Sequence, residues 1–140
     1  KVRMTAIDVS EKALELAREN AELNEAEINF IQSDLFTRIR ERFDLIVSNP
    51  PYIPSAEIET LQREVKDFEP RLALDGGADG LEIYRKIAAD VSKHLTRGGT
   101  LLMEVGAGQA EEVVKLFKGN SYSMIIKDFN GVDRYVKIVM

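Results

Sequence analysis

The segment Asn49-Pro50-Pro51-Tyr52 has the clearest chemical signal in this sequence. It follows a continuous apolar run at 43–48, which is typical of a buried parallel strand. Proline after Asn49 favours an extended conformation there, and the two successive prolines fix the backbone while removing two N–H donors. The acceptors that remain are the Asn49 side-chain oxygen and the Pro50 carbonyl. This rigid pair suits the two hydrogens of a planar –NH2 group, and Tyr52 supplies an aromatic wall for a flat substrate.

Two acidic residues also stand at the ends of predicted strands, where ligands bind in open α/β sheets. Asp8 ends the first strand and can accept hydrogen bonds from both hydroxyls of a ribose. Asp34 follows the second strand and can accept from an adenine amino group, with Leu35 packing on the ring. A purely structural role stays open for each: a helix cap for Asp8, a turn for Asp34, and a strand terminator for the two prolines.

Alternating strand and helix patterns indicate an α/β fold with a mostly parallel sheet. Strands are expected at 2–8, 28–31, 43–48 and 100–105, and helices at 10–23, 81–95 and 110–117. The second helix is expected to end in a left-handed cap at Gly98-Gly99. Two last strands, 122–129 and 135–139, are joined through Asn130-Gly131 and should form an antiparallel hairpin. The stretch 53–80 is rich in Pro, Gly and acidic residues, with at most a short helix near 58–65, and long irregular stretches are often functional.

The amino-acid composition and the net charge argue against several classes of function. The 140 residues, 44% hydrophobic and 31% charged, predict one soluble domain, and a formal net charge of -5 argues against tight nucleic-acid binding. The sequence has no cysteine and one histidine, so thiol chemistry is excluded and no metal site is expected. No apolar run approaches the roughly 18 residues of a membrane span, and residues 1–10 read as a strand and not as a signal peptide. These features predict a cytoplasmic protein without membrane contact.

The Asn49–Tyr52 segment matches the signature of S-adenosylmethionine (SAM)-dependent methyltransferases that act on planar amino groups. The whole chain resembles the HemK/PrmC family of protein-(glutamine-N5) methyltransferases, which modify peptide chain release factors. Supporting segments lie at 6–10, 32–35, 47–54, 68–80 and 104–106. The resemblance implies a Rossmann-like class I methyltransferase fold, SAM as the cofactor, a release factor as the protein partner and a role in translation termination.

Residue by residue, the resemblance implies that Asp8 holds the cofactor ribose and that Asp34 and Leu35 bind the adenine. It assigns Asn49, Pro50, Pro51 and Tyr52 to the target glutamine. Asn49 is also expected to contact the cofactor. Asn49 and Pro50 are the expected catalytic residues, because they can orient the amide nitrogen for direct in-line methyl transfer.

The family's glycine-rich cofactor loop follows a first strand, and no such loop precedes Val2. The chain also starts at Lys1, without an initiator Met. Residues 1–140 therefore resemble the C-terminal portion of a catalytic domain that lacks its first strand. In the family this strand lies between those expected at 2–8 and 43–48, so two apolar strand edges should be exposed. Gly106-Ala107-Gly108 matches only half of a G-x-G-x-x-G loop and is not expected to bind phosphate.

Two other functions stay open. The first is a nucleic-acid amino methyltransferase acting on adenine N6 or guanine N2, which the negative charge and the lack of an evident basic stripe disfavour. The second is a truncated module without catalysis, which binds a release factor or another protein through the 53–80 segment. Methyl transfer by the protein would distinguish an enzyme from a binding module.

Overall fold

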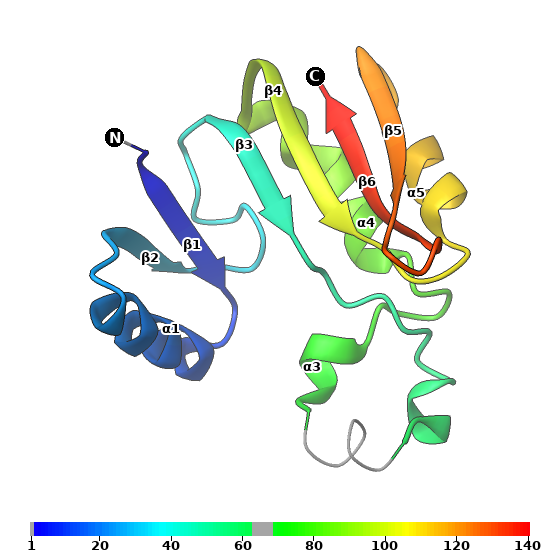
Figure 1. Cartoon of the computed structure of the whole chain (residues 1–140), viewed down its shortest axis with the longest axis horizontal. Helices are drawn as coiled ribbons and strands as arrows, with labels where there is room; N and C mark the ends of the chain where they lie inside the picture. Colours follow the sequence, from blue (N-terminus) through cyan, green and yellow to red (C-terminus); the bar gives the residue numbers. More distant parts are fainter. Residues whose placement is uncertain (1, 63–68) are drawn as a thin grey trace. The chain divides into compact units, whose positions relative to one another are not determined.

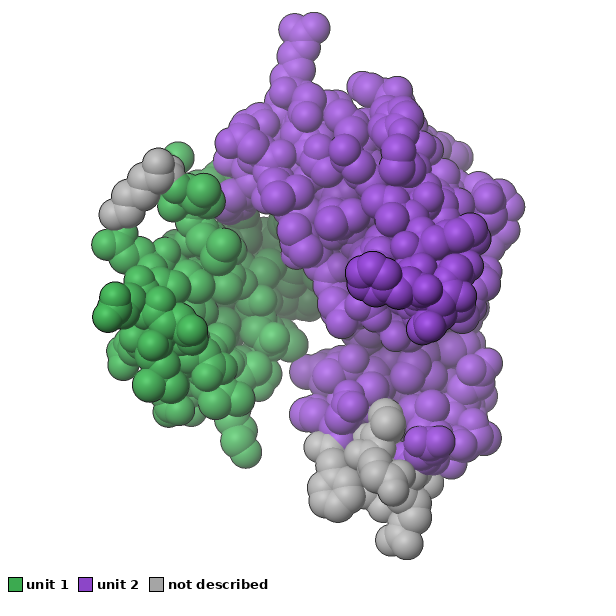
Figure 2. Space-filling view, in the orientation of Figure 1, with its two compact units in different colours: residues 1–41 green, residues 42–140 purple. Residues whose placement is uncertain are grey.

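The computed structural model describes residues 2–62 and 69–140 of the chain. The chain divides into two compact units, residues 1–41 and 42–140, which Figure 2 shows in different colours. Phe68, the first residue of the 68–80 segment, and the 63–65 end of the expected short helix lie outside the described residues. The single domain expected from the chain length stays a prediction.

The first unit is a strand–helix–strand element (Figure 1). Strand β1 (Met4–Asp8) and strand β2 (Ile28–Gln32) pair in parallel, and helix α1 (Glu11–Leu23) connects them. The side chain of Ser10 caps α1 by accepting a hydrogen bond from the Ala13 N–H at 3.3 Å. Because the strands are parallel and in register, both end at the same edge, and Asp8 lies opposite Gln32.

The second unit contains a four-stranded mixed sheet in the order β3-β4-β6-β5. Strands β3 (Phe43–Ser48) and β4 (Leu95–Glu104) are parallel, whereas β6 (Asp133–Val139) is antiparallel to β4 and to β5 (Tyr122–Lys127). Helices α4 (Glu82–Asp90) and α5 (Ala110–Leu116) lie on one face of this sheet (Figure 1). The expected parallel pairing and the C-terminal antiparallel hairpin are confirmed.

Burial is concentrated on the sheet face under these helices. Residues two apart on a strand point to the same face. Such positions on β4 and β6 are completely buried, together with residues of the helices and of the 3-10 turn η2 (Val91–Lys93). The buried side chains are Leu101, Met103, Val136, Ile138, Tyr84, Val91 and Val113. This packing fixes the carboxyl end of β4 beside that of β3.

The helix before β4 is shorter than expected, and β4 is longer. Helix α4 ends at Asp90 and β4 begins at Leu95, so the cap predicted at Gly98-Gly99 is wrong. Both glycines lie inside the strand, in an irregularity where the pairing with β3 skips several residues. Gly98 has a φ of +76° and its N–H donates to the Met140 carbonyl at 2.7 Å, so the left-handed conformation forms a bulge instead of a helix end.

Within the described part of the chain, β1 and β3 each have one unpaired edge, as do the other two outer strands, β2 and β5. There, β1 pairs only with β2, and β3 pairs only with β4. Met4 on β1 is 53% exposed, and Leu45 and Val47 on β3 are 57% and 66% exposed. The edges of β1 and β3 that were expected to be exposed are therefore unpaired among the described residues, and both strands carry exposed apolar side chains.

The long segment between β3 and α4 contains little regular structure. A 3-10 turn η1 (Ile58–Thr60) stands where a short helix was expected, and a single helical turn α3 (Arg71–Leu74) follows. An isolated parallel bridge joins Ile53 to Asp75, so the two ends of the segment meet. Among the residues that the structure describes, no helix is long and apolar enough to cross a membrane.

Candidate active site

The Asn49–Tyr52 segment directly follows β3 and therefore lies at the carboxyl edge of the second unit's sheet. The Asn49 side chain is exposed, Pro50 is buried, and Tyr52 is half-buried. Within the described residues, neither the Asn49 side-chain oxygen nor the Pro50 carbonyl accepts a hydrogen bond. Both oxygens therefore keep their capacity to accept hydrogen bonds within the described chain.

The ring of Tyr52 is fixed beside the end of β4. Its hydroxyl donates to Glu104 Oε1 at 3.4 Å, and a Cβ added at Gly106 would lie 3.0 Å from Tyr52 Cδ2. Burial raises the pKa of the Tyr52 hydroxyl, the Glu104 carboxylate raises it further, and the Arg134 guanidinium opposes this effect. The Tyr52 phenol therefore stays protonated at neutral pH and can donate a hydrogen bond, while its ring offers an aromatic surface.

Two further groups hold the end of β4. Tyr84 of α4 is completely buried, and its hydroxyl donates to the backbone carbonyl of Glu104 at 2.8 Å. Burial raises the pKa of the Tyr84 hydroxyl well above its usual value, so this donor is permanent. Arg134 of β6 donates to the Val105 carbonyl at 3.4 Å and to the carboxylate of Asp128 at 3.4 Å. The strand end that carries Glu104 is thus fixed from two sides.

The chain after Tyr52 is held by the segment that leads into α4. The Ile53 N–H donates to the Leu74 carbonyl at 3.0 Å, and the Ile53 carbonyl accepts from the Gly76 N–H at 2.9 Å. The Ser55 hydroxyl donates to Asp75 at 2.6 Å, and this bond is the largest cause of the lowered pKa of Asp75. The described part of the 68–80 segment therefore supports the candidate site and is more than a surface loop.

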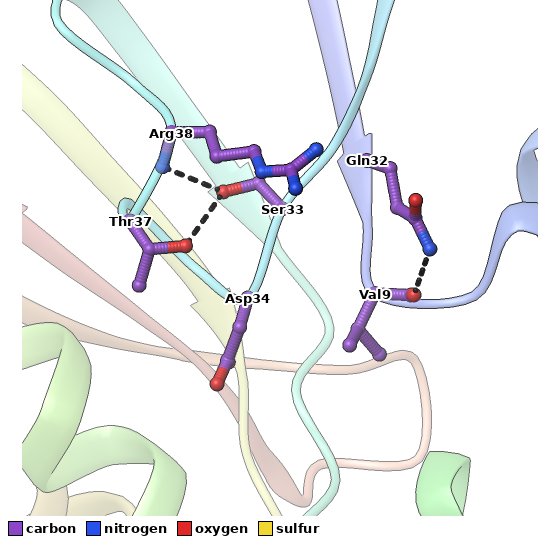
Figure 3. A pocket seen from close by; sticks show the side chains of 6 residues that line it. All are labelled: Val9, Gln32, Ser33, Asp34, Thr37 and Arg38. Carbon is purple, nitrogen blue, oxygen red and sulfur yellow. Dashed lines mark hydrogen bonds between the residues drawn. The ribbon is translucent and has the colours of Figure 1, made fainter.

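The first unit carries a pocket of about 280 Å³ at the carboxyl edge of its two strands. Its lining residues are Val9, Gln32, Ser33, Asp34, Thr37 and Arg38 (Figure 3). The Asp34 carboxylate points away from the neighbouring Ser33, Thr37 and Arg38 side chains (Figure 3). Asp8 stands at the same edge, where its Oδ1 accepts from the Ser10 N–H at 2.8 Å. The helix cap is Ser10 and not Asp8, so the helix-cap role considered for Asp8 is wrong. The other carboxylate oxygen of Asp8 has no partner among the described residues.

Ser33 is a site residue that sequence reasoning missed. Its side chain is only 4% exposed; its hydroxyl donates to the Leu35 carbonyl at 2.8 Å and accepts from the Arg38 N–H at 3.1 Å. These bonds close the turn in which Leu35 adopts a φ of +47°, a conformation uncommon outside glycine. A small polar residue directly after a strand was the one available signal. Ser33 therefore fixes the turn that presents Asp34 and Leu35.

The predicted site residues fall into two groups. Asp8, Asp34 and Leu35 lie at one edge of the first unit, and Asn49 through Tyr52 lie in the second. Each group is assembled by a parallel strand pair, as the sequence indicated. The expectation that one cofactor reaches both groups stays a prediction.

The profile of the methyltransferase small domain family matches residues 1–76. A release factor glutamine methyltransferase of Geobacter sulfurreducens is 44% identical over 137 residues, covering 96% of this chain and 48% of that protein. One from Fusobacterium nucleatum is 44% identical over 138 residues, covering 95% of this chain and 39% of that protein. The resemblance inferred from the motifs is confirmed, and the chain spans half or less of the length of these relatives.

Solved structures agree on the fold. A methyltransferase from Pyrococcus furiosus has a TM-score of 0.65 at 20% identity and covers 98% of this chain and 62% of its own. TrmN from Thermus thermophilus also has a TM-score of 0.65, at 17% identity, with 98% and 36% covered. A further relative, SMU.776 complexed with SAH, has a TM-score of 0.61 at 12% identity, with 99% and 38% covered. The expected Rossmann-like class I methyltransferase fold is confirmed.

Proposed function

This chain belongs to the methyltransferase small domain family, and on that premise we propose that the protein methylates the side-chain amide nitrogen (N5) of a glutamine in a peptide chain release factor. The methyl donor is SAM. The names of the two relatives, release factor glutamine methyltransferases, support this choice of substrate. A release factor acts in translation termination in the cytoplasm, and the proposed enzyme works in the same compartment.

One observation carries the proposal: the Asn49 oxygen and the Pro50 carbonyl are adjacent acceptors without partners in the described chain. A primary amide presents two N–H donors on one nitrogen, so the two acceptors can bind both hydrogens at once. An amine held by one hydrogen bond would rotate freely. Two acceptors on a backbone stiffened by successive prolines leave the nitrogen one orientation.

The chemical difficulty is that an amide nitrogen is a weak nucleophile, because its lone pair is delocalised into the carbonyl. When bound, SAM supplies an electrophilic methyl group on a sulfonium. Asn49 and Pro50 hold the nitrogen toward this methyl, and their oxygens stabilise the positive charge that develops on the nitrogen. The nitrogen would form the new N–C bond as the methyl–sulfur bond breaks and the sulfur leaves with that electron pair as a neutral thioether, and the nitrogen would then release one proton to water. No general base is needed before transfer.

The residues of the first unit suit the cofactor. The Asp8 carboxylate keeps one oxygen without a partner in the described chain, which suits a ribose hydroxyl. The pocket at residues 33–38 offers the Asp34 carboxylate for an amino group. We assign Asp8 to the ribose, Asp34 and Leu35 to the adenine, and Asn49 to the edge facing the methyl group.

The test is methyl transfer by the full-length native protein. We would incubate it with isotopically labelled SAM and a purified release factor, and locate the label by peptide mass spectrometry. The proposal predicts one methyl group on a glutamine side chain, and transfer that is slower by about 100-fold or more in an Asn49→Ala variant that still folds. Label found only in added nucleic acid would favour amino methylation of bases. No transfer to either substrate would favour the binding module without catalysis.

A further inference from the structure

The side-chain amide of Gln109 joins two parts of the candidate active site. Gln109 directly precedes α5, and its Nε2 donates to the Tyr52 carbonyl at 3.0 Å. Its Oε1 accepts from the Gly106 N–H at 3.1 Å. Reversing the amide would place two donors together and two acceptors together, so the hydrogen-bond partners fix its orientation.

Two glycines, Gly80 and Gly106, lie so close to the Gln109 amide that a side chain at either position would collide with it. A Cβ at Gly80 would lie 2.3 Å from the Tyr52 carbonyl oxygen and 2.6 Å from Gln109 Nε2. A Cβ at Gly106 would lie 2.5 Å from Gln109 Oε1. Gly80 also has a φ of +74°, a conformation that side chains disfavour. The Gln109 amide therefore occupies a slot between two backbones that only glycine allows to come so close.

The position of the Tyr52 carbonyl affects where the two proposed acceptors, the Asn49 side-chain oxygen and the Pro50 carbonyl, lie. Prolines 50 and 51 lack N–H groups, so neither can be anchored as a donor. In the described chain, the Asn49 and Pro50 oxygens also have no partner. The pairing of β3 with β4 fixes the start of the Asn49–Tyr52 segment. At its end, the Gln109 side chain donates a hydrogen bond to the Tyr52 carbonyl.

We propose that Gln109 is a positioning residue that holds the Asn49–Tyr52 segment in the geometry that receives the target amide. It acts through the Tyr52 carbonyl and touches neither substrate nor cofactor. This inference rests on the proposed function, since it names what aligns that site. Small displacements of a reacting group cost large factors in rate, so a single hydrogen bond here affects turnover.

The variant Gln109→Glu separates positioning from packing. It has the same shape and can still accept from the Gly106 N–H, but its ionised carboxylate cannot donate to the Tyr52 carbonyl. In the full-length protein we expect kcat/KM for the release factor to fall about tenfold or more, as for loss of a hydrogen bond beside the reacting group. The Kd for SAM should stay within about twofold. Glu111→Gln, an exposed change in the same helix, is the control and should behave like the unmodified protein.

Acid should restore the missing donor. A protonated carboxyl can donate to the Tyr52 carbonyl, so the ratio of kcat/KM between Gln109→Glu and the unmodified protein should rise as pH approaches about 4.3. Gln109→Leu has no donor at any pH and should show no such rise. Glu104 and Arg134, the charged groups that act on Tyr52, are the same residues in all variants.

Amide hydrogen exchange tests positioning without any activity. Exchange of the Ile53 and Gly76 N–H groups should be faster in both Gln109 variants than in Glu111→Gln. Unchanged exchange would overturn the inference, as would a lower melting temperature with kcat/KM per folded molecule unchanged. If the unmodified protein methylates no glutamine, the proposed function fails, and hydrogen exchange still decides whether Gln109 holds the segment.

Discussion

Replacing Ser33 by alanine tests how the first unit presents its cofactor residues. Ser33 is 4% exposed, and its hydroxyl bonds to the Leu35 carbonyl at 2.8 Å, to the Arg38 N–H at 3.1 Å and to the Thr37 hydroxyl at 3.3 Å. Alanine removes all three bonds, but Thr37 is exposed and its hydroxyl can bond water instead, so two backbone groups are left short of a partner. At a net value of about 1 kcal/mol for each of the two backbone bonds, the turn loses about 2 kcal/mol.

This loss should weaken SAM binding. Leu35 has a φ of +47°, so its turn relaxes to a commoner conformation when the hydroxyl is absent. Ordering the turn again on binding then costs up to the whole 2 kcal/mol, which is about a 30-fold change in Kd. We expect SAM affinity to fall by about 10- to 30-fold and the free energy of unfolding to fall by at most about 2 kcal/mol.

The assay is calorimetric titration of the full-length protein with SAM, with denaturant unfolding measured in parallel. Ser92→Ala is the matched control, because Ser92 is exposed in η2 and its loss should change neither quantity. If Ser33→Ala binds SAM as tightly as Ser92→Ala does, the turn at 33–38 does not form the cofactor site, and the reasoning is refuted.

Three further changes have defined outcomes. Asp8→Asn keeps a side-chain oxygen that can accept from the Ser10 N–H but loses the charge offered to the ribose. SAM affinity measured by calorimetry should therefore fall about tenfold with stability little changed, and equal affinity would remove Asp8 from the site. Gly80→Ala introduces a Cβ 2.3 Å from the Tyr52 carbonyl oxygen at a φ of +74°, so denaturant unfolding should show a loss of about 2 kcal/mol or more, and an unchanged midpoint would contradict the close approach. Hydrogen bonding from Arg85 lowers the pKa of Asp79 from 3.8 to about 2, so its stabilising contribution is present above the unfolded value and disappears as pH falls through the folded value. The difference in melting temperature between Asp79→Asn and the unmodified protein should therefore shrink between about pH 4 and pH 2, and a difference that grows in acid would reverse the sign of the argument.

Much of the fold was readable from sequence because strand and helix periodicity are local signals. The β1–α1–β2 element and the Asn130-Gly131 hairpin follow from patterns within a few residues. The boundary between α4 and β4 was not readable. Gly98-Gly99 has the composition of a helix cap. The Gly98 N–H donates to the carbonyl of Met140, which is distant in the sequence, and the two glycines form a bulge in β4 instead. Hydrogen bonds to residues distant in the sequence determine whether such glycines end a helix or form a bulge, and a local sequence pattern does not predict these bonds.

The site shows the same division. Asp8, Asp34 and Asn49 stand at strand ends, so the strand pattern made them candidates, and the family resemblance gave each its proposed role. Ser33 and Gln109 were not, because each acts through backbone groups whose position depends on the folded chain. Gln109 reaches a carbonyl 57 residues earlier in the sequence, so its role depends on how β3 and β4 bring those segments together.

The most direct test of the central claim is single-turnover methyl transfer by Asn49→Ala, with SAM affinity measured on the same preparation. If Asn49 and Pro50 orient the target amide, the rate of transfer to a glutamine should fall by about 100-fold or more while the Kd for SAM changes by less than about threefold. Transfer and affinity falling by the same factor would mean that Asn49 serves the cofactor and not the amide. Transfer at an unchanged rate would contradict the account.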